Sequence, residues 1–310
     1  MNRSLGAMGP AVPLLLALVT ALPVSGQRPL PRLIGTADLE RRLTEETGGG
    51  RRLPVVLDVR QPWTSYLQNH LPGAAWLNVE TLRAQQGELP FQLLPAEHYA
   101  ALFHRLGIEP EVPVVVYSAG EQLDIDATFT VWLLAAAGAT EVYLLDGGYA
   151  KWDLEARPLT QRYPRARPGT GRFRPREFRA PVASLEEVKA ASAGESPALL
   201  VDARPQEQYG GSAGAQMRRG HIPGAVNHPW KDDLEKRDVA LVWKDTTALR
   251  AGYVAQGITP DRDIILYCNS GTEASHVYFA LRYLLGYPRV RIFTGSWTQW
   301  AEREELPVER

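Results

Sequence analysis

The sequence predicts an α/β protein made of two similar units, each with a mainly parallel sheet and helices on both faces. Three observations predict this class. Four sequence blocks of the first half return in the same order in the second half, at offsets of 144 to 151 residues. Within each half, short apolar runs alternate with stretches of helical periodicity, as in sheets whose parallel strands are joined by helices. The length of 310 residues also suits two domains of ordinary size.

The repeated blocks mark the strands and the turns between them. LPVVLDVR at 53–60 returns as PALLVDAR at 197–204, HLPGA at 70–74 as HIPGA at 221–225, GIEPEVPVVVYS at 107–118 as GITPDRDIILYC at 257–268, and VYLLDGGYAKW at 142–152 as VRIFTGSWTQW at 290–300. Each copy of the first block reads as a buried strand that ends in Asp-x-Arg. The second copy carries about seven extra residues within 210–219. The two units therefore correspond strand for strand.

The stretches between the strands have the periodicity of helices, and one segment has none. Helices are expected at 96–106, 127–137, 185–193, 246–256 and 274–285. Residues 155–181 are rich in Pro, Arg and Gly and lack any period, which is typical of a linker. We therefore expect an N-terminal domain at 27–158, a linker at 159–180 and a C-terminal domain at 181–310.

The first 26 residues resemble an export signal. Arg3 is the only charged side chain before an apolar run at 11–22, and small residues at 24–26 offer a cleavage point. The run is short for a membrane span. We expect residues 1–26 to be removed as a signal peptide, leaving a periplasmic or secreted protein with no membrane span; an uncleaved apolar anchor is the alternative. The net charge of −1 and the lack of a basic block do not favour a nucleic-acid partner.

Cys268 is the only cysteine and marks the candidate catalytic position. It follows the apolar run 264–267 and opens a short polar loop before helical sequence resumes, so it lies at the carboxyl end of a strand, where open α/β sheets bind ligands. Backbone N–H groups of such a loop favour a thiolate and lower the pKa of the cysteine. The alternative is a buried cysteine that acts only as a small hydrophobic residue. The candidate loop comprises Asn269, Ser270, Gly271, Thr272, Glu273, Ala274 and Ser275.

These blocks together resemble the rhodanese family in its tandem form, the thiosulfate and 3-mercaptopyruvate sulfurtransferases. The resemblance spans about residues 33–308 and rests on DVR…HLPGA, DAR…GHIPGA, the strand ending in Tyr-Cys, and the closing Gly-Ser-Trp-x-x-Trp. It implies two rhodanese-like domains, each with a mainly parallel five-stranded sheet flanked by helices. It also implies that Cys268 is the nucleophile and that the N-terminal domain, with Ser118 at the matching position, is not catalytic.

The resemblance implies a sulfurtransferase that works without a cofactor. A sulfur atom of thiosulfate or 3-mercaptopyruvate would pass through a Cys268 persulfide to cyanide or a thiol, with Asp202 and Arg204 bracing the loop or forming only a structural salt bridge. The loop CNSGTE is similar to the mercaptopyruvate type at Ser270 and Gly271 and lacks the two basic residues of the thiosulfate type. The family's carboxylate-binding arginine is replaced by Gln208, and Arg219 is a candidate to take its place.

The sequence also bears on three other functions. Related cysteine phosphatases need an arginine six residues after the cysteine, and that residue here is Ala274. One cysteine and scattered histidines show no metal-ligand spacing, so no metal site is expected. An exported sulfur-carrier or redox-binding module, loaded by a protein partner and without turnover on small donors, is the remaining alternative.

Overall fold

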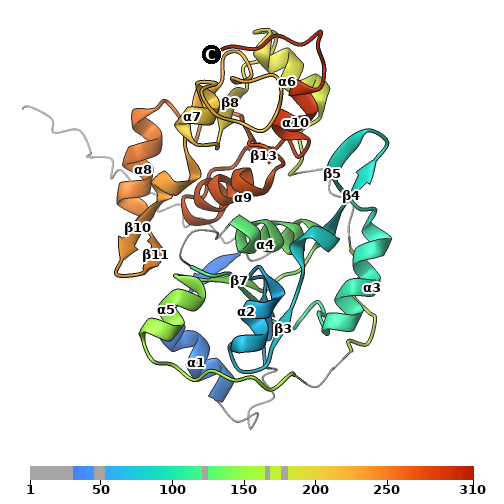
Figure 1. Ribbon diagram of the computed structural model, residues 1–310, viewed down its shortest axis with the longest axis vertical. Coiled ribbons are helices and arrows are strands. Elements are labelled where there is room, and N and C mark those ends of the chain that lie inside the picture. The colour runs from blue at the N-terminus through green and yellow to red at the C-terminus, as the bar shows by residue number, and fades with distance from the viewer. Residues whose placement is uncertain (1–30, 45–52, 121–124, 165–167, 176–180) are drawn as a thin grey trace, which may run out of the picture.

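The computed structural model describes residues 31–44, 53–120, 125–164, 168–175 and 181–310. The residues of the expected signal peptide lie outside these ranges. Figure 1 shows two domains, one above the other, with the first half of the chain forming the lower domain and the second half the upper one. In the described ranges, no helix is both long enough and apolar enough to cross a membrane.

The N-terminal domain is built on a five-stranded parallel sheet of order β1-β7-β6-β2-β3. Its strands, in chain order, are β1 (Arg32–Ile34), β2 (Val55–Asp58), β3 (Ala74–Trp76), β6 (Val114–Tyr117) and β7 (Val142–Leu145). β2 and β6 lie in the middle and are almost fully buried. They pair in parallel from Val55 with Val114 to Asp58 with Tyr117, which places Asp58 at the carboxyl edge of the sheet.

The C-terminal domain repeats this sheet with one strand reduced to a single bridge. The strands are β8 (Leu199–Asp202), β9 (Val226–Asn227), β12 (Ile264–Tyr267) and β13 (Val290–Ile292), in the order β13-β12-β8-β9. Val182 bridges Ile292 in parallel, in the place that β1 occupies in the first domain. The prediction of two mainly parallel sheets is confirmed. The second sheet has four strands instead of the expected five, because the chain at its edge pairs with β13 through a single residue.

Helices cover both sheets close to the predicted ranges. The N-terminal domain contains α1 (Thr36–Thr44), α2 (Trp63–Gln68), η1 (Val79–Leu82), α3 (Ala96–Leu106), α4 (Ile125–Ala137) and α5 (Gly148–Leu154). The C-terminal domain contains α6 (Leu185–Ser192), α7 (Gln206–Tyr209), η2 (Trp230–Asp233), α8 (Thr246–Ala255), α9 (Thr272–Tyr278), η3 (Phe279–Leu284) and α10 (Ser296–Ala301). The linker makes no helix among its described residues, and Thr160 pairs only with His70 in an isolated bridge.

The two domains share one apolar core. α4 and α9 are buried along almost their whole length and pack against each other at the junction seen in the middle of Figure 1. The largest hydrophobic cluster therefore runs without a break from Phe129 and Trp132 of α4 to Val277 and Phe279 of the second domain. Each sheet has a smaller cluster of its own on the opposite face. A continuous core holds the two domains in a defined orientation.

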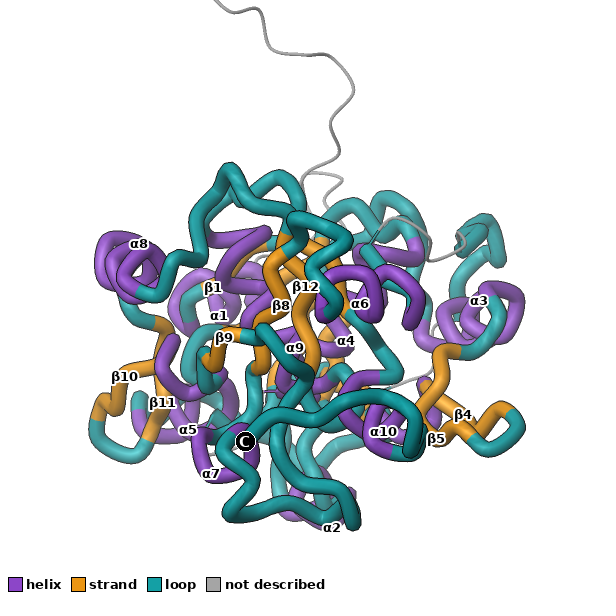
Figure 2. The backbone as a smooth tube through the Cα atoms, turned by 90° about the horizontal axis from the view of Figure 1, so that it is seen from above, coloured by secondary structure: helices purple, strands orange, loops and turns teal. Residues whose placement is uncertain are grey.

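Each domain also extends a two-stranded antiparallel hairpin toward the other. The hairpins are β4 (Arg83–Gln86) with β5 (Leu89–Leu93), and β10 (Leu234–Arg237) with β11 (Ala240–Trp243). Figure 2 shows them on opposite sides of the molecule with α4 and α9 between them. The N–H of Leu241 donates to the Gly120 carbonyl at 2.7 Å, close to Ser118 of the first domain. The first hairpin makes the matching contact with the cysteine loop, as described below.

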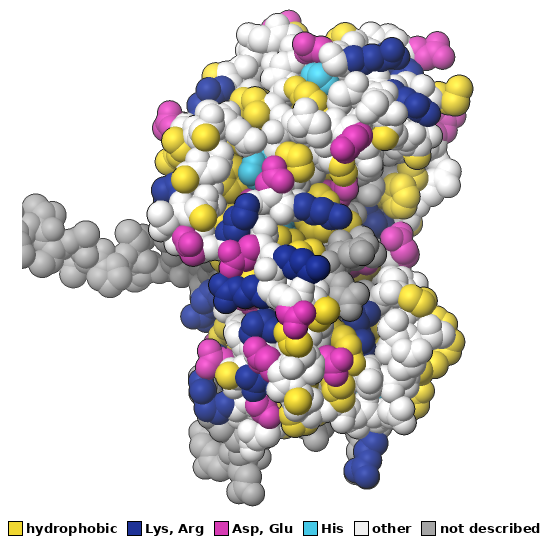
Figure 3. Space-filling model, turned by 60° about the vertical axis from the view of Figure 1, so that its left-hand side comes forward, with side chains coloured by type: hydrophobic (Ala, Val, Ile, Leu, Met, Phe, Trp, Pro, Cys, Tyr) yellow, Lys and Arg dark blue, Asp and Glu magenta, His cyan; other side chains and the backbone are white. Residues whose placement is uncertain are grey.

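Acidic and basic side chains are interspersed over the face seen in Figure 3. Blue and magenta atoms alternate around the level where the two domains meet, without a broad field of one sign. This mixture agrees with the nearly balanced formal charge of the chain.

Candidate active site

Cys268 lies at the end of β12, where the sequence placed it, and only 1% of the residue is exposed. Its Sγ accepts a hydrogen bond from the Gly271 N–H at 3.0 Å, and the backbone N–H groups of Ser270 and Ala274 also face the sulfur. Gly271 has a φ of +88°, a left-handed conformation that residues with a Cβ rarely adopt. This turn points three N–H groups at one sulfur atom and opens α9.

The pKa of Cys268 moves in the direction opposite to the one expected from the helix start. Burial is the main cause that raises the pKa of Cys268 to about 12; the charge of Glu273 also acts in the raising direction, and the N–H groups of Ala274, Ser270 and Gly271 act in the lowering direction. The N–H groups of the loop are visible in the sequence, whereas the burial of the sulfur follows from the packing of the two domains. Burial therefore favours the thiol form of Cys268 over the thiolate.

Glu273 stands next to this thiol in the first turn of α9. Its Oε2 lies 3.4 Å from Asn269 Nδ2. Burial raises the pKa of Glu273 to about 7, with a further rise from the charge of Asp202, while Cys268 and Arg204 act in the lowering direction. Near neutral pH this carboxyl group can therefore both accept and donate a proton.

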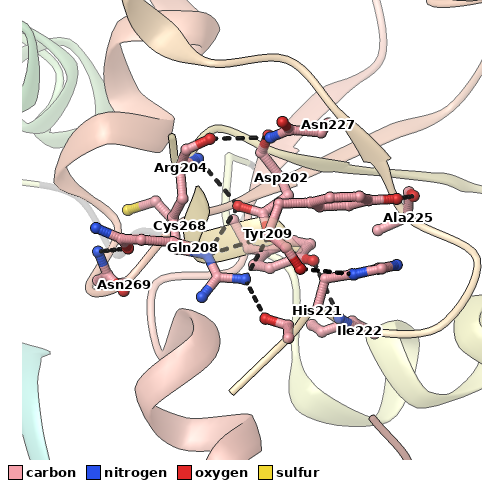
Figure 4. Close-up of polar contacts among 12 residues, drawn as sticks. Asp202, Arg204, Gln208, Tyr209, His221, Ile222, Ala225, Asn227, Cys268 and Asn269 are labelled. Atoms are coloured by element: carbon pink, nitrogen blue, oxygen red, sulfur yellow. Dashed lines mark hydrogen bonds and ion pairs between the residues drawn. The ribbon is translucent and has the colours of Figure 1, made fainter. Parts of the chain in front are cut away.

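Asp202 and Arg204 form a buried ion pair beneath the loop (Figure 4). Arg204 Nε lies 3.0 Å from both Asp202 oxygens, Nη2 lies 2.6 Å from Oδ2, and Nη2 also donates to the Gly220 carbonyl at 2.7 Å. The first domain repeats the pair with Asp58 and Arg60, although it has no cysteine. The pair is thus a structural element of each domain, and in the second domain it also lies directly below the cysteine loop.

Several polar contacts hold the first residues of the loop. Asn269 Nδ2 donates to Gln208 Oε1 at 2.9 Å, a contact drawn in Figure 4. The Asn269 carbonyl accepts from the N–H and the hydroxyl of Thr298. Gln216, in the segment that is longer than in the first repeat, donates to the same hydroxyl at 3.1 Å. Gln208, which replaces the expected arginine, therefore supports the loop.

Ser296 is a site residue that the sequence argument did not single out. Its Oγ accepts a hydrogen bond from the Cys268 N–H at 3.2 Å and donates to the Phe293 carbonyl at 2.8 Å. Ser296 has a φ of +51°. The matching residue of the first repeat is Gly148, which has nearly the same φ of +52°. A serine in this strained conformation at the back of the cysteine is a mark of a functional site. The signal was present in the alignment of the repeats, where Gly-Gly becomes Gly-Ser.

Arg83 is a second residue that the sequence argument missed, and it comes from the other domain. Its Nη1 donates to the Ser270 carbonyl at 3.0 Å and to the Thr272 hydroxyl at 3.2 Å, and lies 3.4 Å from the Ser270 hydroxyl. Its side chain is 4% exposed and its guanidinium lies over the rings of Phe91 and Phe129. The first domain therefore contributes directly to the loop that surrounds the cysteine.

The remaining loop residues face the domain junction. Ser275 donates to the Thr272 carbonyl at 2.6 Å, and its hydroxyl lies 3.1 Å from that of Thr128 on α4. Ala274 is fully buried, and its N–H is one of those that face the sulfur. The loop is thus held from its own domain at one end and from the first domain at the other.

Two basic candidates lie away from the sulfur. Arg219 is exposed and lines an open hollow together with Met217, Arg218, Val308, Glu309 and Arg310, a set that contains none of the loop residues. His221 stacks on Tyr209 with ring centroids 3.6 Å apart, and its Nδ1 bonds to the Tyr209 carbonyl. His221 therefore fixes its turn. Among the described residues, no group of three or more His, Cys, Asp or Glu could hold a metal ion.

The first domain keeps the frame of the site, with Ser118 in the place of the cysteine. Ser118 is buried, its carbonyl accepts the Tyr149 N–H at 2.9 Å, and the Ala119 carbonyl accepts the Ala150 N–H. Cys268 and Asn269 accept from Trp297 and Thr298 in the same way. Residues 121–124, which continue the loop after Gly120, lie outside the described residues. The difference between the two sites thus begins at the side chain that follows the strand.

Comparison with known proteins agrees with this geometry. The family model for the rhodanese-like domain matches twice, at residues 38–155 and 184–303. The sulfur carrier protein TtuD of Thermus thermophilus is 34% identical over 267 residues, which are 82% of this chain and 90% of that protein. The 3-mercaptopyruvate sulfurtransferase of Escherichia coli K12 is 31% identical over 252 residues, 79% and 84% of the two chains.

Two further comparisons cover most of the chain. The thiosulfate sulfurtransferase of Azotobacter vinelandii is 30% identical over 289 residues, 90% of this chain and 97% of that protein. A solved structure of an EanB variant in complex with ergothioneine superimposes with a TM-score of 0.77 at 21% identity, over 90% of this chain and 70% of that one. At this identity the structural match shows a shared fold.

Proposed function

Because the chain belongs to the rhodanese family, with two rhodanese-like domains, we propose that it is a sulfurtransferase that carries a sulfur atom on Cys268. The observation that carries the proposal is the set of three loop N–H groups that face the Cys268 sulfur, with the Gly271 nitrogen at 3.0 Å. Two relatives of this chain are named as sulfurtransferases, and the matches cover 84% and 97% of those proteins.

The proposed reaction has two steps. In the first, the Cys268 thiolate attacks the transferable sulfur of the donor; a sulfur–sulfur bond forms, and the bond between that sulfur and the rest of the donor breaks. The electron pair leaves with sulfite from thiosulfate, or with the enolate of pyruvate from 3-mercaptopyruvate. In the second, cyanide or a thiol attacks the outer sulfur and restores the thiolate.

The loop supports both steps because its donors are already in place. A persulfide anion is larger than a thiolate and extends its charge toward the N–H groups of Ser270, Gly271 and Ala274. Donors that are fixed before the reaction stabilise the developing charge without reorganising. Arg83 and Asn269 hold the loop from its two sides and so keep these donors aimed.

A sulfur carrier that is loaded by a protein partner is the second candidate function. It is favoured by the relative named as a sulfur carrier protein and by the low exposure of Cys268, which is 1%. A carrier would form the same persulfide but would receive its sulfur from another protein. The two candidates therefore differ in the donor and share the role of Cys268.

Intact-mass analysis tests both candidates. The purified protein is incubated separately with thiosulfate and with 3-mercaptopyruvate and is then treated with cyanide. We expect a gain of one sulfur atom, about 32 Da, that cyanide removes and that is missing in Cys268→Ser. A gain with neither donor would reject the small-molecule reaction and favour the carrier. A gain that persists in Cys268→Ser would reject Cys268 as the attachment site.

We also propose that residues 1–26 direct export and are removed, so that the protein works in the periplasm or outside the cell. The short apolar run with a single preceding charge supports this proposal. Expression of the full chain in a bacterial host, followed by N-terminal sequencing of the protein in each cell fraction, tests it. A protein that begins at Gln27 in the periplasm or medium is expected; an intact Met1 in the cytoplasm would reject export.

A further inference from the structure

One peptide of the cysteine loop joins the sulfur of Cys268 to a charged side chain of the other domain. The Gly271 N–H donates to Cys268 Sγ at 3.0 Å, and the carbonyl of the same peptide, which belongs to Ser270, accepts from Arg83 Nη1 at 3.0 Å. A trans peptide points its N–H and its C=O in opposite directions, so these two contacts lie at the two ends of one dipole. The guanidinium is at the negative end of that dipole, and the sulfur is at the positive end.

The surroundings of Arg83 preserve its charge and screen it weakly. Its side chain is 4% exposed, and its guanidinium carbon lies 5.0 Å and 4.8 Å from the ring centroids of Phe91 and Phe129. A guanidinium stays protonated even when it is buried. Its acidic neighbour Glu80, 3.4 Å from Nη2, is 63% exposed and is therefore largely solvated. A cation in such surroundings polarises the groups that it bonds more strongly than a cation in water does.

The first domain shows how the matching carbonyl is bonded where no cysteine is present. Gly120 corresponds to Ser270, because it follows Ser118 by two residues as Ser270 follows Cys268. The Gly120 carbonyl accepts the backbone N–H of Leu241, from the hairpin of the other domain, at 2.7 Å. A neutral donor thus makes the contact between hairpin and loop in the domain without the cysteine.

The two hairpins differ in the residue with which they begin. β4 begins with Arg83, whereas β10 begins with Leu234, an apolar residue that is also buried. A buried guanidinium is costly to keep in a position that an apolar residue can fill. The charge of Arg83 therefore needs an explanation beyond the joining of the two domains, and the sulfur at the other end of its peptide supplies one.

The sulfur is surrounded by charges of both signs. The charged side chains of this region are Glu273, Asp202 and Arg204 of the second domain, and Arg83, Glu80 and Asp126 of the first. Asp202 and Arg204 neutralise each other as an ion pair, whereas the charge of Glu273 acts against an anion on the sulfur. A positive charge that reaches the sulfur through the loop offsets the effect of Glu273.

We propose that Arg83 acts on the Cys268 sulfur through the Ser270–Gly271 peptide: its charge polarises the peptide and so favours the sulfur anion. This inference rests on the proposed function, in which Cys268 is a thiolate before the transfer and a persulfide after it. Arg83 acts through the loop and is therefore a positioning residue. It exchanges no proton or electron with the donor.

The first test follows the ionisation of Cys268 by NMR and needs no sulfur donor. The cysteine Cβ is labelled with an NMR-active isotope, and since the chain has one cysteine, one resonance reports the sulfur. In Arg83→Met the thiolate should form about one pH unit higher than in the wild type. A cation close to a titrating group moves its pKa by about one to three units, and the peptide between Arg83 and the sulfur places this effect at the lower end.

Two further variants control this titration. Arg83→Lys keeps a charged donor at the same position and should titrate closer to the wild type than Arg83→Met does. Arg237→Met removes an exposed arginine from the equivalent hairpin of the second domain, where its partner is Glu235 at the surface. The control should leave the titration of Cys268 unchanged.

Thr272→Val separates the effect of the charge from the support of the loop. It removes the contact of Arg83 with the Thr272 hydroxyl at 3.2 Å and leaves the bond to the Ser270 carbonyl. Thr272→Val and Arg83→Met should both lower the melting temperature, but only Arg83→Met should displace the titration. The amide proton of Gly271 gives a second readout: its resonance should move upfield in Arg83→Met, because a less polarised N–H forms a weaker hydrogen bond, and should stay in place in Thr272→Val.

The results separate this inference from the proposed function. A titration that coincides in Arg83→Met and wild type, or an equal displacement in Thr272→Val, would overturn the role of the Arg83 charge. If the protein unfolds before the titration is complete, the Gly271 resonance decides, and an unmoved resonance in Arg83→Met would overturn the inference. If Arg83→Met does not fold, Arg83→Gln, which keeps a neutral donor, replaces it and should show the same displacement. A wild-type protein that gains no sulfur from either donor would reject the proposed enzyme instead, while the titration would still report whether Arg83 acts on the sulfur.

Discussion

Replacing Arg83 by methionine tests whether the first domain takes part in catalysis. Methionine keeps an apolar stem of similar length against Phe91 and Phe129 but removes the guanidinium and its bonds to Ser270 and Thr272. The side chain is 4% exposed, so water cannot readily replace the lost donor. The cysteine loop should therefore lose its support from the first domain while the core remains filled.

The expected magnitude follows from the hydrogen bonds. A hydrogen bond from a charged group contributes about 1.5–3 kcal/mol, and the 3.0 Å bond to the Ser270 carbonyl is the shortest of the set. We expect Arg83→Met to lower the free energy of unfolding by about 2 kcal/mol. If holding the loop in its reactive arrangement costs the same amount, the rate of persulfide formation should fall about 30-fold.

Two measurements check this prediction: denaturant unfolding, and the rate of the one-sulfur mass gain after rapid mixing with donor. Arg237→Met is the matched control, because Arg237 lies on the equivalent hairpin of the second domain and is exposed, with a surface partner in Glu235. The control should leave both quantities unchanged. If Arg83→Met is destabilised but forms persulfide at the wild-type rate, the contact is structural only. If neither quantity changes, the loop is held by its own domain and the reasoning is refuted.

Three further predictions follow from the structure. Gly271→Ala should cost about 1–2 kcal/mol because of its φ of +88°, and should slow persulfide formation by displacing the N–H that lies 3.0 Å from the sulfur; folding to wild-type stability with full activity would contradict this. Asp58→Asn should cost about 3–5 kcal/mol by leaving Arg60 buried without its partner, but folded protein, assayed well below its melting temperature, should form persulfide normally, whereas Asp202→Asn should impair both stability and rate. Glu155 is partly buried, which opposes ionisation, but Lys151, Thr36 and Arg157 lower its pKa from 4.5 to about 2, so its stabilisation is present above pH 4.5 and disappears as the pH falls toward 2; the difference in unfolding free energy between wild type and Glu155→Gln should shrink over that range.

The fold was readable from the sequence because its signals are local and occur twice. The Asp-x-Arg strand ends, the buried apolar runs and the helical stretches recur in both halves, and the helix expected at 96–106 is α3 to the residue. The reduction of one strand to a bridge at Val182 could not be read, because it depends on how far one chain edge stays in register with Ile292. Whether a segment can form a strand depends on its own sequence, whereas the length of that strand depends on the chain with which it pairs.

The site was readable in part, for a related reason. Cys268 and its loop form one short segment, so their order already placed the thiol at a strand end and a helix start. Arg83 could not be found in the same way, because its contact with Ser270 joins residues 187 positions apart. The rise of the Cys268 pKa was missed because burial comes from the packing of both domains, which no local pattern reports. The repeat alignment could have identified Ser296, since only glycine suits its conformation without strain.

The reciprocal hairpins have a consequence for how this protein responds to dilution. Two copies of a single domain that completed each other's loops would form a symmetric dimer, and such a dimer separates into incomplete halves at low concentration. Here the domain that supplies Arg83 is joined by the chain itself to the domain that carries Cys268, so its effective concentration does not fall when the protein is diluted. The specific activity should accordingly stay constant down to the lowest concentration that can be assayed. The tandem arrangement thus completes the loop within one molecule, whereas separate domains would complete it only at concentrations high enough for them to associate.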